Sequence, residues 1–448
     1  MSRSYDAVVI GGGPGGYVAA IRLAQLGKKV VIIEKNEFGG TCTNKGCIPT
    51  KALLTAAHLY RDIKEKSSKF GIKVGDLKYE VSGIMKHMKK SVMLSKKGIE
   101  FLLKKNNVDI IKNEAKLKDR ETIVVKDEEI HAKNIVLAQG SKAIVFPPFD
   151  EIPGIWTSDD VFEMDKMPKS ILIIGGGVIG VEFATFFSSF GVEVHLVEIA
   201  EHILPYEDED VAEEIKKELR KMKVNIYENT KVEEIKRGEQ LYIAKMGDLK
   251  IKTEKILLAV GRKPNITDDI KNIGVKVEKG VITDEYMRTN IENIFAVGDI
   301  KGEIMLAHVA MFEGIVAAHN IADDERKMDY SAVPSVIFSN PEIASVGLRE
   351  GDVDKEKVNI WKFPVSANGR ARTMEERTGF AKVIEDKKTK EVLGVTIVSP
   401  NATDMIMEGV IAVKYKMTSH QITETIHPHP TLTETLLGAF EGDLSIHI

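Results

Sequence analysis

The sequence predicts an α/β protein in which one strand–turn–helix–strand unit occurs twice and is followed by a smaller α+β domain. The two units begin at apolar runs, residues 7–10 and 171–174, that lead directly into glycine-rich turns. From about residue 333 the pattern changes to short strands with alternating polar positions. A chain of 448 residues is long enough for about three domains of ~150 residues each.

The first unit contains the parts of a dinucleotide-binding βαβ unit in the expected order. A buried strand, residues 7–10, runs into three spaced glycines, and the helix that follows ends at Gly27. The next strand, residues 30–33, ends at Glu34, whose carboxylate can accept a hydrogen bond from a ribose hydroxyl. The glycines that would form the turn, approach the pyrophosphate and pack the helix are Gly11, Gly13 and Gly16. The alternative is a glycine-rich turn that binds no ligand.

The second unit repeats this order. The strand at residues 171–174 leads through glycines into a helix that extends to Phe190, and the strand at residues 192–197 ends at Glu198. An acid at this position favours the free ribose hydroxyl of NAD over the 2′-phosphate of NADP, although it also suits a surface acid after a strand. The positions that would contact this second dinucleotide are Gly175, Gly177, Ile179 and Gly180.

Both cysteines of the chain lie in one short stretch flanked by glycines. Cys42 and Cys47 are separated by four residues, and a turn through Gly46 would bring them within disulfide distance. Pro49 suits the first position of a helix, so Cys47 would lie just before a helix N-terminus, where free amides and the dipole stabilise a thiolate. Lys51 adds a positive charge one turn later.

Three uses of this cysteine pair are open. Two thiolates without a Cys or His partner at the usual spacing make a poor zinc site. A purely structural disulfide is unusual in a chain with so few cysteines. The sequence therefore favours a redox-active pair, and a dithiol beside two dinucleotides indicates an electron relay.

Other predicted strands end in turns that carry candidate ligands. A buried strand after residue 134 ends in a tight turn at Gly140, and another buried strand ends at Gly261. The strand at residues 293–297 delivers Asp299 to a turn, where its carboxylate is a candidate ligand or serves only as a turn former. A helix opens soon afterwards, and His308 at its start is expected to cap or pack.

A histidine-containing arm precedes the last predicted helix. The prolines of this arm bias the preceding His427 and His429 toward an extended backbone. Thr431 and Glu434 have the spacing of a capping box for a helix over residues 432–440. Capping accounts for Glu434 but leaves the histidines unexplained, and the unperturbed pKa of histidine suits proton transfer near neutrality.

Composition excludes several classes of function. The net charge is −4, and the lysines of residues 60–105 interleave with few aromatic residues, so they indicate a solvated helical face rather than a nucleic-acid site. No apolar run approaches the ~18 residues of a membrane span, and the apolar N-terminal run is too short for a signal peptide. We therefore expect a cytoplasmic protein with no nucleic-acid or membrane partner and no metal.

The stretch around the cysteines resembles the redox-disulfide signature of the pyridine nucleotide–disulfide oxidoreductases, and related motifs continue from Val8 to Glu434. The resemblance implies a glutathione-reductase-like fold with two Rossmann-like domains, a C-terminal α+β dimerisation domain, and FAD and NAD as cofactors. The domains it implies are an FAD-binding domain with the redox disulfide (1–145), an NAD-binding domain (146–265), a central segment that completes the FAD site (266–330) and a dimerisation domain (331–448).

The resemblance also implies roles for the catalytic candidates. Cys42 would exchange with the substrate, while Cys47 would lie against the flavin as the charge-transfer thiol. His429 would be the base, oriented by Glu434, and would reach the disulfide of the other subunit in a homodimer.

The cofactor contacts implied by resemblance extend beyond the glycine turns. Lys51 would pair with Glu182 beside the flavin, although Glu182 equally suits an acid that complements a helix N-terminus. Asp299 would bind the ribityl chain, and Ala307 would contact the isoalloxazine. Gln139 stands where the family usually has a small hydroxyl residue. The remaining implied cofactor positions are Gly40, Thr41, Ala115, Gly140 and Gly261.

The implied activity is oxidation of dihydrolipoamide, or of protein-bound dihydrolipoyl groups, with reduction of NAD⁺. The implied partners are a second copy of the chain and a 2-oxo acid dehydrogenase or glycine-cleavage complex. Glu198 and the lack of an arginine cluster argue against a glutathione-type reductase, and the lack of a C-terminal cysteine pair argues against a mercuric-type one. A non-catalytic flavoprotein subunit is the alternative from another class.

Overall fold

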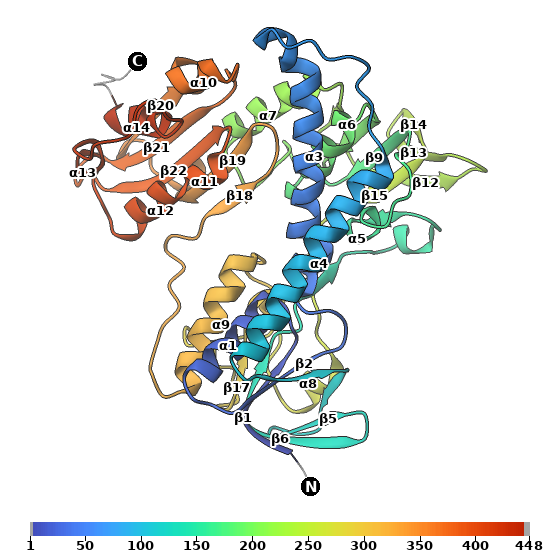
Figure 1. Cartoon of the computed structure of the whole chain (residues 1–448), viewed down its shortest axis with the longest axis vertical. Helices are drawn as coiled ribbons and strands as arrows, with labels where there is room; N and C mark the ends of the chain where they lie inside the picture. The colour runs from blue at the N-terminus through green and yellow to red at the C-terminus, as the bar shows by residue number, and fades with distance from the viewer. Residues whose placement is uncertain (1–2, 443–448) are drawn as a thin grey trace.

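Two mainly parallel β-sheets, one for each glycine turn, form the centres of two lobes, and an antiparallel sheet forms the centre of a third (Figure 1). The computed structural model describes residues 3–442. The predicted α/β class is confirmed by these sheets and by the helices that cover them. The predicted domain boundaries stay a prediction.

The first lobe has the strand order β3-β2-β1-β6-β5-β4, and β17 from later in the chain pairs with β6. Because Ile10 of β1 lies opposite Ile33 of β2 and Leu137 of β6, these three parallel strands end at one edge of the sheet. The chain leaves β1 for β2 on one side and returns to β6 on the other, which makes the crevice at this edge a topological switch point for ligands. The elements of this lobe are β1 (Arg3–Ile10), α1 (Pro14–Gln25), β2 (Val30–Glu34), α2 (Gly40–Lys45), α3 (Cys47–Lys66), α4 (Val81–Lys105), β3 (Asp109–Lys112), β4 (Ala115–Leu117), β5 (Thr122–Val125), β6 (Glu128–Leu137), α8 (Asp268–Asn272), β17 (Ile294–Ala296) and α9 (Ala307–Ile321).

The second lobe repeats this arrangement around the parallel order β11-β10-β9-β15-β8. Ile174 of β9 lies opposite Val197 of β10 and Leu258 of β15, so the second glycine turn also leaves the sheet at a shared strand edge. An antiparallel meander and a two-stranded ribbon, β16 with β7, lie outside this sheet. The elements are β7 (Ser141–Ala143), β8 (Trp156–Thr157), α5 (Ser158–Val161), β9 (Ser170–Ile174), α6 (Val178–Ser189), β10 (Glu193–Val197), α7 (Glu209–Lys221), β11 (Asn225–Tyr227), β12 (Glu234–Arg237), β13 (Tyr242–Met246), β14 (Leu249–Thr253), β15 (Lys255–Leu258) and β16 (Arg262–Pro264).

The third lobe is built on the antiparallel order β18-β19-β22-β21-β20. β20 lacks a clear strand pattern in the sequence and was not predicted, because this edge strand is only partly buried and carries a lysine and a terminal proline. The elements are β18 (Ser335–Ile337), β19 (Glu342–Gly347), β20 (Val358–Pro364), α10 (Gly369–Thr373), β21 (Phe380–Asp386), β22 (Val392–Ser399), α11 (Ala402–Met405), α12 (Met407–Lys414), α13 (Ser419–Thr423) and α14 (Glu434–Glu441).

Helices α3 and α4 extend from the first lobe toward the upper lobes (Figure 1). α3 packs against α6, which is buried on nearly every face and contributes the fully buried Phe183, Phe186 and Phe187. A helix that is buried on nearly every face belongs in a core, and this core is shared by α3 of the first lobe and α6 of the second. The lysines of α4 are mostly exposed, which confirms the predicted solvated face.

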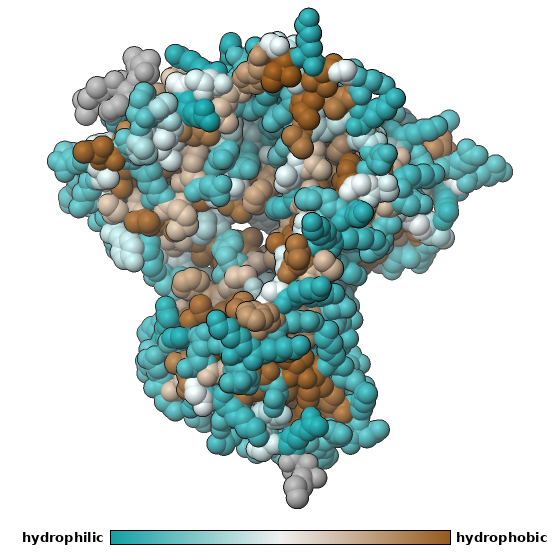
Figure 2. Space-filling model, viewed as in Figure 1, coloured by the Kyte–Doolittle hydropathy of each residue, from teal (hydrophilic) through white to brown (hydrophobic). Residues whose placement is uncertain are grey.

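Exposed apolar side chains occur on the third lobe around α12 and α13, and small brown patches mark this lobe in Figure 2. The exposed apolar residues in this region are Met407, Ile411, Tyr415 and Ile426. No helix within residues 3–442 combines the length and apolar character that crossing a bilayer requires.

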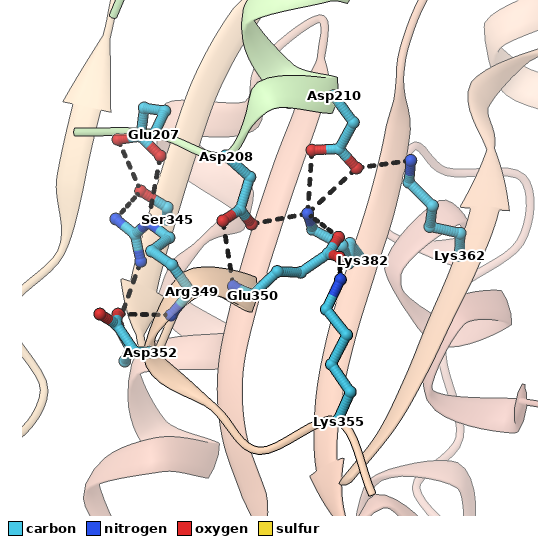
Figure 3. A network of polar contacts seen from close by, with 11 residues as sticks. Glu207, Asp208, Asp210, Ser345, Arg349, Glu350, Asp352, Lys355, Lys362 and Lys382 are labelled. Atoms are coloured by element: carbon cyan, nitrogen blue, oxygen red, sulfur yellow. Dashed lines mark hydrogen bonds and ion pairs between the residues drawn. The ribbon is translucent and has the colours of Figure 1, made fainter. Parts of the chain in front are cut away.

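A network of charges joins the second lobe to the third (Figure 3). The ammonium of Lys382 in β21 contacts Asp208 and Asp210 at the start of α7 and Glu350 after β19, at 2.6–3.0 Å. These three carboxylates lie close enough together to hold one cation, and Lys382 supplies it. Because the lysine side chain is 1% exposed, the network orients the two lobes through buried contacts.

Candidate functional site

The two cysteines lie on either side of one helix break. Cys42 is in α2, Cys47 is the first residue of α3, and Gly46 separates the two helices. The prediction that Pro49 opens the helix is wrong by two residues, since α3 begins at Cys47 and the N–H of Thr50 already donates to the carbonyl of Gly46 at 3.0 Å. Proline is tolerated in this first turn because its missing N–H would have had no intrahelical partner.

The two thiols are free and interact directly with each other. The hydrogen bond from Cys42 lowers the pKa of Cys47 to about 7, helped by the positive charge of Lys51 and opposed by burial. The same contact, with burial, raises the pKa of the Cys42 thiol. Cys47 is therefore the sulfur that ionises first, as its position at a helix N-terminus predicts.

Lys51 and Glu182 form an ion pair beside the thiols. Lys51 Nζ donates to both carboxylate oxygens of Glu182 at 2.8 and 3.0 Å, and the acid is 5% exposed. The pairing implied by resemblance is thus present, although a place beside a flavin stays a prediction. Glu182 lies in α6 of the second lobe, so the pair also spans the contact between two lobes.

The first glycine turn has the geometry that a dinucleotide requires. A Cβ on Gly11 would lie 2.2 Å from the carbonyl oxygen of Ala138, and one on Gly16 would lie 1.9 Å from that of Gly11. Packing alone therefore requires glycine at both positions. A Cβ on Gly13 would meet nothing nearer than 3.8 Å, so no packing contact accounts for this glycine, and close approach of a ligand would.

The second turn repeats these three environments. A Cβ on Gly175 would lie 2.4 Å from the carbonyl oxygen of Ala259, and one on Gly180 would lie 1.9 Å from that of Gly175. A Cβ on Gly177 would meet nothing within 4 Å. Ile179 lies in the first turn of α6, next to this open position. Two turns with the same open middle glycine fit two dinucleotides.

The acids at the strand ends are held in place by the turns themselves. Glu34 accepts a hydrogen bond from the N–H of Gly12 at 2.6 Å, and Glu198 accepts one from Gly176 at the same distance. Both acids are buried, so the alternative of a surface acid at Glu198 is wrong. A carboxylate fixed beside the turn faces the place where a ribose would follow the pyrophosphate.

A polar cluster unites the turn that carries Asp299 with the cysteine segment. Asp299 Oδ2 accepts a hydrogen bond from the hydroxyl of Ser141 at 2.5 Å, and Arg262 Nε donates to the same hydroxyl at 2.9 Å. Arg262 also donates to Thr41 Oγ1 at 3.3 Å. No local sequence pattern singles out Ser141 or Arg262, because their partners are more than 100 residues away.

Buried charges support the backbone beside Asp299. Glu313 in α9 accepts a hydrogen bond from the N–H of Gly298 at 2.6 Å with one carboxylate oxygen. The other oxygen accepts from Lys301 at 2.8 Å and from the hydroxyl of Tyr330 at 2.5 Å. These contacts fix the turn on which Asp299 lies, and no sequence pattern had pointed to them.

The remaining predicted cofactor positions lie at the starts of elements or in turns after strands, and they belong to both lobes. Ala115 begins β4, shortly after Lys112, which lies opposite Glu34 in the sheet. Ala307 is the first residue of α9. The other predicted contacts, Gly40, Gly140 and Gly261, all have positive φ.

Gln139 supplies a test of whether a ligand fits this cradle. Gln139 lies two residues after β6, at the switch point of the sheet, and its buried Oε1 has no hydrogen-bond partner among residues 3–442. A buried carbonyl oxygen without a donor is costly, and FAD carries hydroxyl and N–H donors. The site therefore fits a bound dinucleotide with such donors.

The C-terminal arm holds a histidine whose ring is 78% exposed. His429 Nδ1 hydrogen-bonds to Glu434 Oε1 at 2.8 Å, and the other carboxylate oxygen accepts the N–H of Thr431 at 2.8 Å. An ionised Glu434 can only accept hydrogen bonds, so Nδ1 is the protonated ring nitrogen that donates to it, and Nε2 is left as the acceptor. The capping-box prediction is half correct, because Glu434 reaches back to Thr431 while α14 begins only at Glu434, with Thr433 as its N-cap.

This arm and the cysteines lie apart within one chain. Among the contacts recorded for residues 3–442, none joins His429 to Cys42 or Cys47, and Figure 1 shows α14 at the far side of the third lobe from the start of α3. His427 instead hydrogen-bonds to Glu408 at 2.8 Å. His308 contacts the carbonyl of Pro334 at 2.9 Å, which confirms that it packs.

Comparison with known proteins agrees with this geometry. The chain matches the family model "Pyridine nucleotide-disulphide oxidoreductase" over residues 5–314 and the dimerisation-domain model of that family over residues 333–440. It is 40% identical to dihydrolipoyl dehydrogenase of Geobacillus stearothermophilus, covering 99% of this chain and 97% of that protein. It is 39% identical to dihydrolipoyl dehydrogenase of Bacillus subtilis (strain 168), with the same coverage. The solved structure of the HOCl-induced flavoprotein disulfide reductase RclA from Escherichia coli matches with a TM-score of 0.89 at 28% identity, covering 98% of this chain and 99% of that one.

The family models account for both halves of the site. One spans both glycine turns and the cysteine pair, and the other spans the histidine arm. The predicted fold, with two dinucleotide-binding lobes and a dimerisation domain, is confirmed, and a dimerisation domain supports the expected homodimer. The chain belongs to the pyridine nucleotide-disulphide oxidoreductases.

Proposed function

We propose that this enzyme oxidises dihydrolipoyl groups to lipoyl groups and reduces NAD⁺, with FAD as the bound cofactor. The observation that carries the proposal is the Cys42–Cys47 pair at the start of α3, with its low-pKa thiol next to a fixed cation. Relatives named dihydrolipoyl dehydrogenase at 36–40% identity over nearly the full chain support the choice of substrate.

The first half-reaction is a thiol–disulfide exchange. One thiolate of the dihydrolipoyl group attacks the sulfur of Cys42, the Cys42–Cys47 bond breaks, and Cys47 leaves as a thiolate. The second substrate thiolate then attacks the substrate sulfur of the mixed disulfide, which closes the lipoyl ring and releases Cys42. The substrate loses two electrons and two protons, and the two electrons reduce the disulfide.

The chain supplies the groups that this exchange requires. Cys47 is a good leaving group because its pKa is lowered, and Lys51 stabilises the charge that develops on it. His429 Nε2 accepts a proton from a substrate thiol, while Glu434 fixes the ring and stabilises its protonated form. The first glycine turn, Asp299 and Ala307 would hold FAD, which when bound would supply the chemistry that links a two-electron dithiol to a hydride acceptor such as NAD⁺.

The second turn binds NAD in this proposal. Glu198 accepts hydrogen bonds from the free ribose hydroxyls, and its carboxylate repels the 2′-phosphate of NADP. The glutathione-type alternative, which would use NADP, is disfavoured on this ground.

The base comes from a second subunit. His429 lies far from the cysteines of its own chain, and a two-fold dimer is the commonest arrangement by which two copies share a site. The exposed apolar residues around α12 and α13 belong to the segment that matches the dimerisation domain. A cytoplasmic location and docking to a 2-oxo acid dehydrogenase or glycine-cleavage complex stay predictions.

The test is steady-state NADH formation from dihydrolipoamide by the purified holoenzyme. We expect turnover with NAD⁺, and loss of nearly all turnover in Cys42→Ser with retained FAD. Parallel assays with glutathione disulfide and NADPH test the main alternative. Bound flavin without turnover of any dithiol or disulfide would support the non-catalytic alternative and overturn the proposal.

A further inference from the structure

Phe338 of the third lobe contacts both members of the Lys51–Glu182 pair. It follows β18 directly, and its backbone N–H donates to Glu182 Oε1 at 3.0 Å. The Lys51 ammonium lies 4.5 Å from the centroid of its ring. One residue therefore meets the carboxylate through its backbone and the ammonium through its aromatic face.

The position of the ring is well defined by packing. Phe338 lies against the apolar cluster that includes Leu53 of α3 and Phe183 of α6, the two helices that carry the ion pair. The ring and the carboxylate therefore both contact the Lys51 ammonium. The lysine side chain is still 31% exposed, so without the ring its ammonium has a route toward water.

The location of this ammonium matters for the redox thiol. Lys51 follows Cys47 by four residues in α3, so the two side chains lie on the same helix face. The positive charge of Lys51 favours the Cys47 thiolate, and the negative charge of Glu182 opposes it. The net effect depends on how the ammonium is shared between the carboxylate, the ring and the sulfur.

Other titratable groups also face Cys47. Cys42 of α2 hydrogen-bonds to it, and Tyr17 of α1 lies near enough that the two sulfurs help to raise the pKa of its hydroxyl, after the larger effect of burial. Neither group is cationic. Lys51 therefore provides the positive charge near the sulfur, and whatever holds Lys51 controls that charge.

We propose that Phe338 is a positioning residue whose aromatic face and backbone N–H hold the Lys51–Glu182 pair, and thereby the Lys51 ammonium, where it stabilises the Cys47 thiolate. The proposal rests on the proposed function, in which Cys47 is the leaving thiolate. It gives the third lobe a second role, separate from the histidine arm, in which Phe338 acts on the redox site of its own chain.

The first test measures Cys47 ionisation without using turnover. In a Cys42→Ser background, the rate of Cys47 alkylation by iodoacetamide is measured against pH for the holoenzyme. Phe338→Leu keeps the backbone N–H and most of the apolar volume but removes the aromatic face. We expect the midpoint of the pH profile of alkylation to rise by about half a pH unit, and the alkylation rate at pH values below that midpoint to fall about threefold. Phe338→Tyr keeps the aromatic face and should restore the midpoint.

A second background separates positioning from packing. With Lys51→Met present, Phe338→Leu should shift the midpoint no further, because there is no ammonium left to hold. An equal shift with and without Lys51, or an unchanged midpoint in Phe338→Leu, would overturn the proposal. Far-UV circular dichroism and FAD content confirm that each variant is folded.

The wild-type chain distinguishes this proposal from the function on which it rests. If wild type fails to oxidise dihydrolipoamide while the alkylation midpoint still shifts in Phe338→Leu and returns in Phe338→Tyr, the proposed substrate is wrong and the role of Phe338 stands. If wild type oxidises dihydrolipoamide normally and the alkylation midpoint is the same with and without Phe338→Leu, the proposed role of Phe338 is wrong and the proposed function stands.

Discussion

Replacing Lys382 with methionine removes the cation that three carboxylates share in the contact between the second and third lobes (Figure 3). The lysine side chain is 1% exposed, and its ammonium contacts Asp208, Asp210 and Glu350 at 2.6, 3.0 and 2.7 Å. Methionine retains the length and the apolar stem but leaves three carboxylates facing one another. Removing one partner of a buried ion pair costs about 3–5 kcal/mol in the free energy of unfolding.

The structure places the expected cost at the lower end of this range. Asp210 and Glu350 are partly exposed and keep a second lysine each, Lys362 and Lys355. We therefore expect Lys382→Met to lose about 3 kcal/mol. The measurement is equilibrium urea unfolding at fixed protein and FAD concentrations, followed by tryptophan fluorescence, since Trp361 lies in β20 beside Lys362.

Lys355→Met is the matched control. Lys355 belongs to the same network, at 3.3 Å from Glu350, but its side chain is largely exposed. An exposed pair of this kind contributes ~0.5 kcal/mol, so this variant should unfold almost as wild type does. A loss below about 1 kcal/mol in Lys382→Met, or equal losses in the two variants, would refute the reasoning that burial gives this contact its strength.

The pH dependence gives an independent check of sign. Burial opposes the charge of Lys382, but its carboxylate partners outweigh burial and raise its pKa. Burial likewise opposes the charge of Asp210 and Glu350, but their lysines outweigh it and lower their pKa values. The stability from these acids is present above their unfolded pKa values, near 4, and is lost as pH falls through the lower folded values. The deficit of Lys382→Met should thus be full near neutral pH and shrink below about pH 5, and a deficit that grows on acidification would contradict this.

Three further predictions concern the redox site. Cys42→Ser, once reduced, should show a long-wavelength thiolate–flavin absorbance band and Cys47→Ser should lack it, and the reverse result would exchange the two assignments. His429→Gln should lose 10²–10⁴-fold in kcat with FAD retained. Mixing it with Cys42→Ser under conditions of subunit exchange should restore activity toward half of wild type, and mixed dimers that stay inactive would show that the base does not act across the dimer. In wild type we expect kcat/KM to be at least about tenfold higher with NAD⁺ than with NADP⁺, and Glu198→Gln should reduce this ratio. Equal kcat/KM values with the two nucleotides in wild type would exclude the assignment of Glu198.

Features that depend on neighbouring residues could be read from the sequence. Both glycine turns, their strands and the acids that end them were predicted, because the period of apolar residues and the steric demands of a tight turn act within about 30 residues. The boundary errors have local causes too. A helix tolerates Pro49 in its first turn as well as at its first position, so the start of α3 was placed two residues late.

The contacts around the cysteines depend on the tertiary structure, and the Lys51–Glu182 pair had been expected from the family resemblance rather than from any local pattern. The sequence by itself placed Cys47 close to Cys42 at the N-terminus of a helix, because that follows from spacing and turn residues, although it put the first helical residue at Pro49. Lys51 meets Glu182 across 131 residues, and Phe338 meets the same acid across 156. No periodic pattern encodes such contacts, since they exist only once α3 has packed on α6 and the third lobe has closed against both. The charge around the redox thiol, and hence its reactivity, is therefore decided by the packing of three lobes.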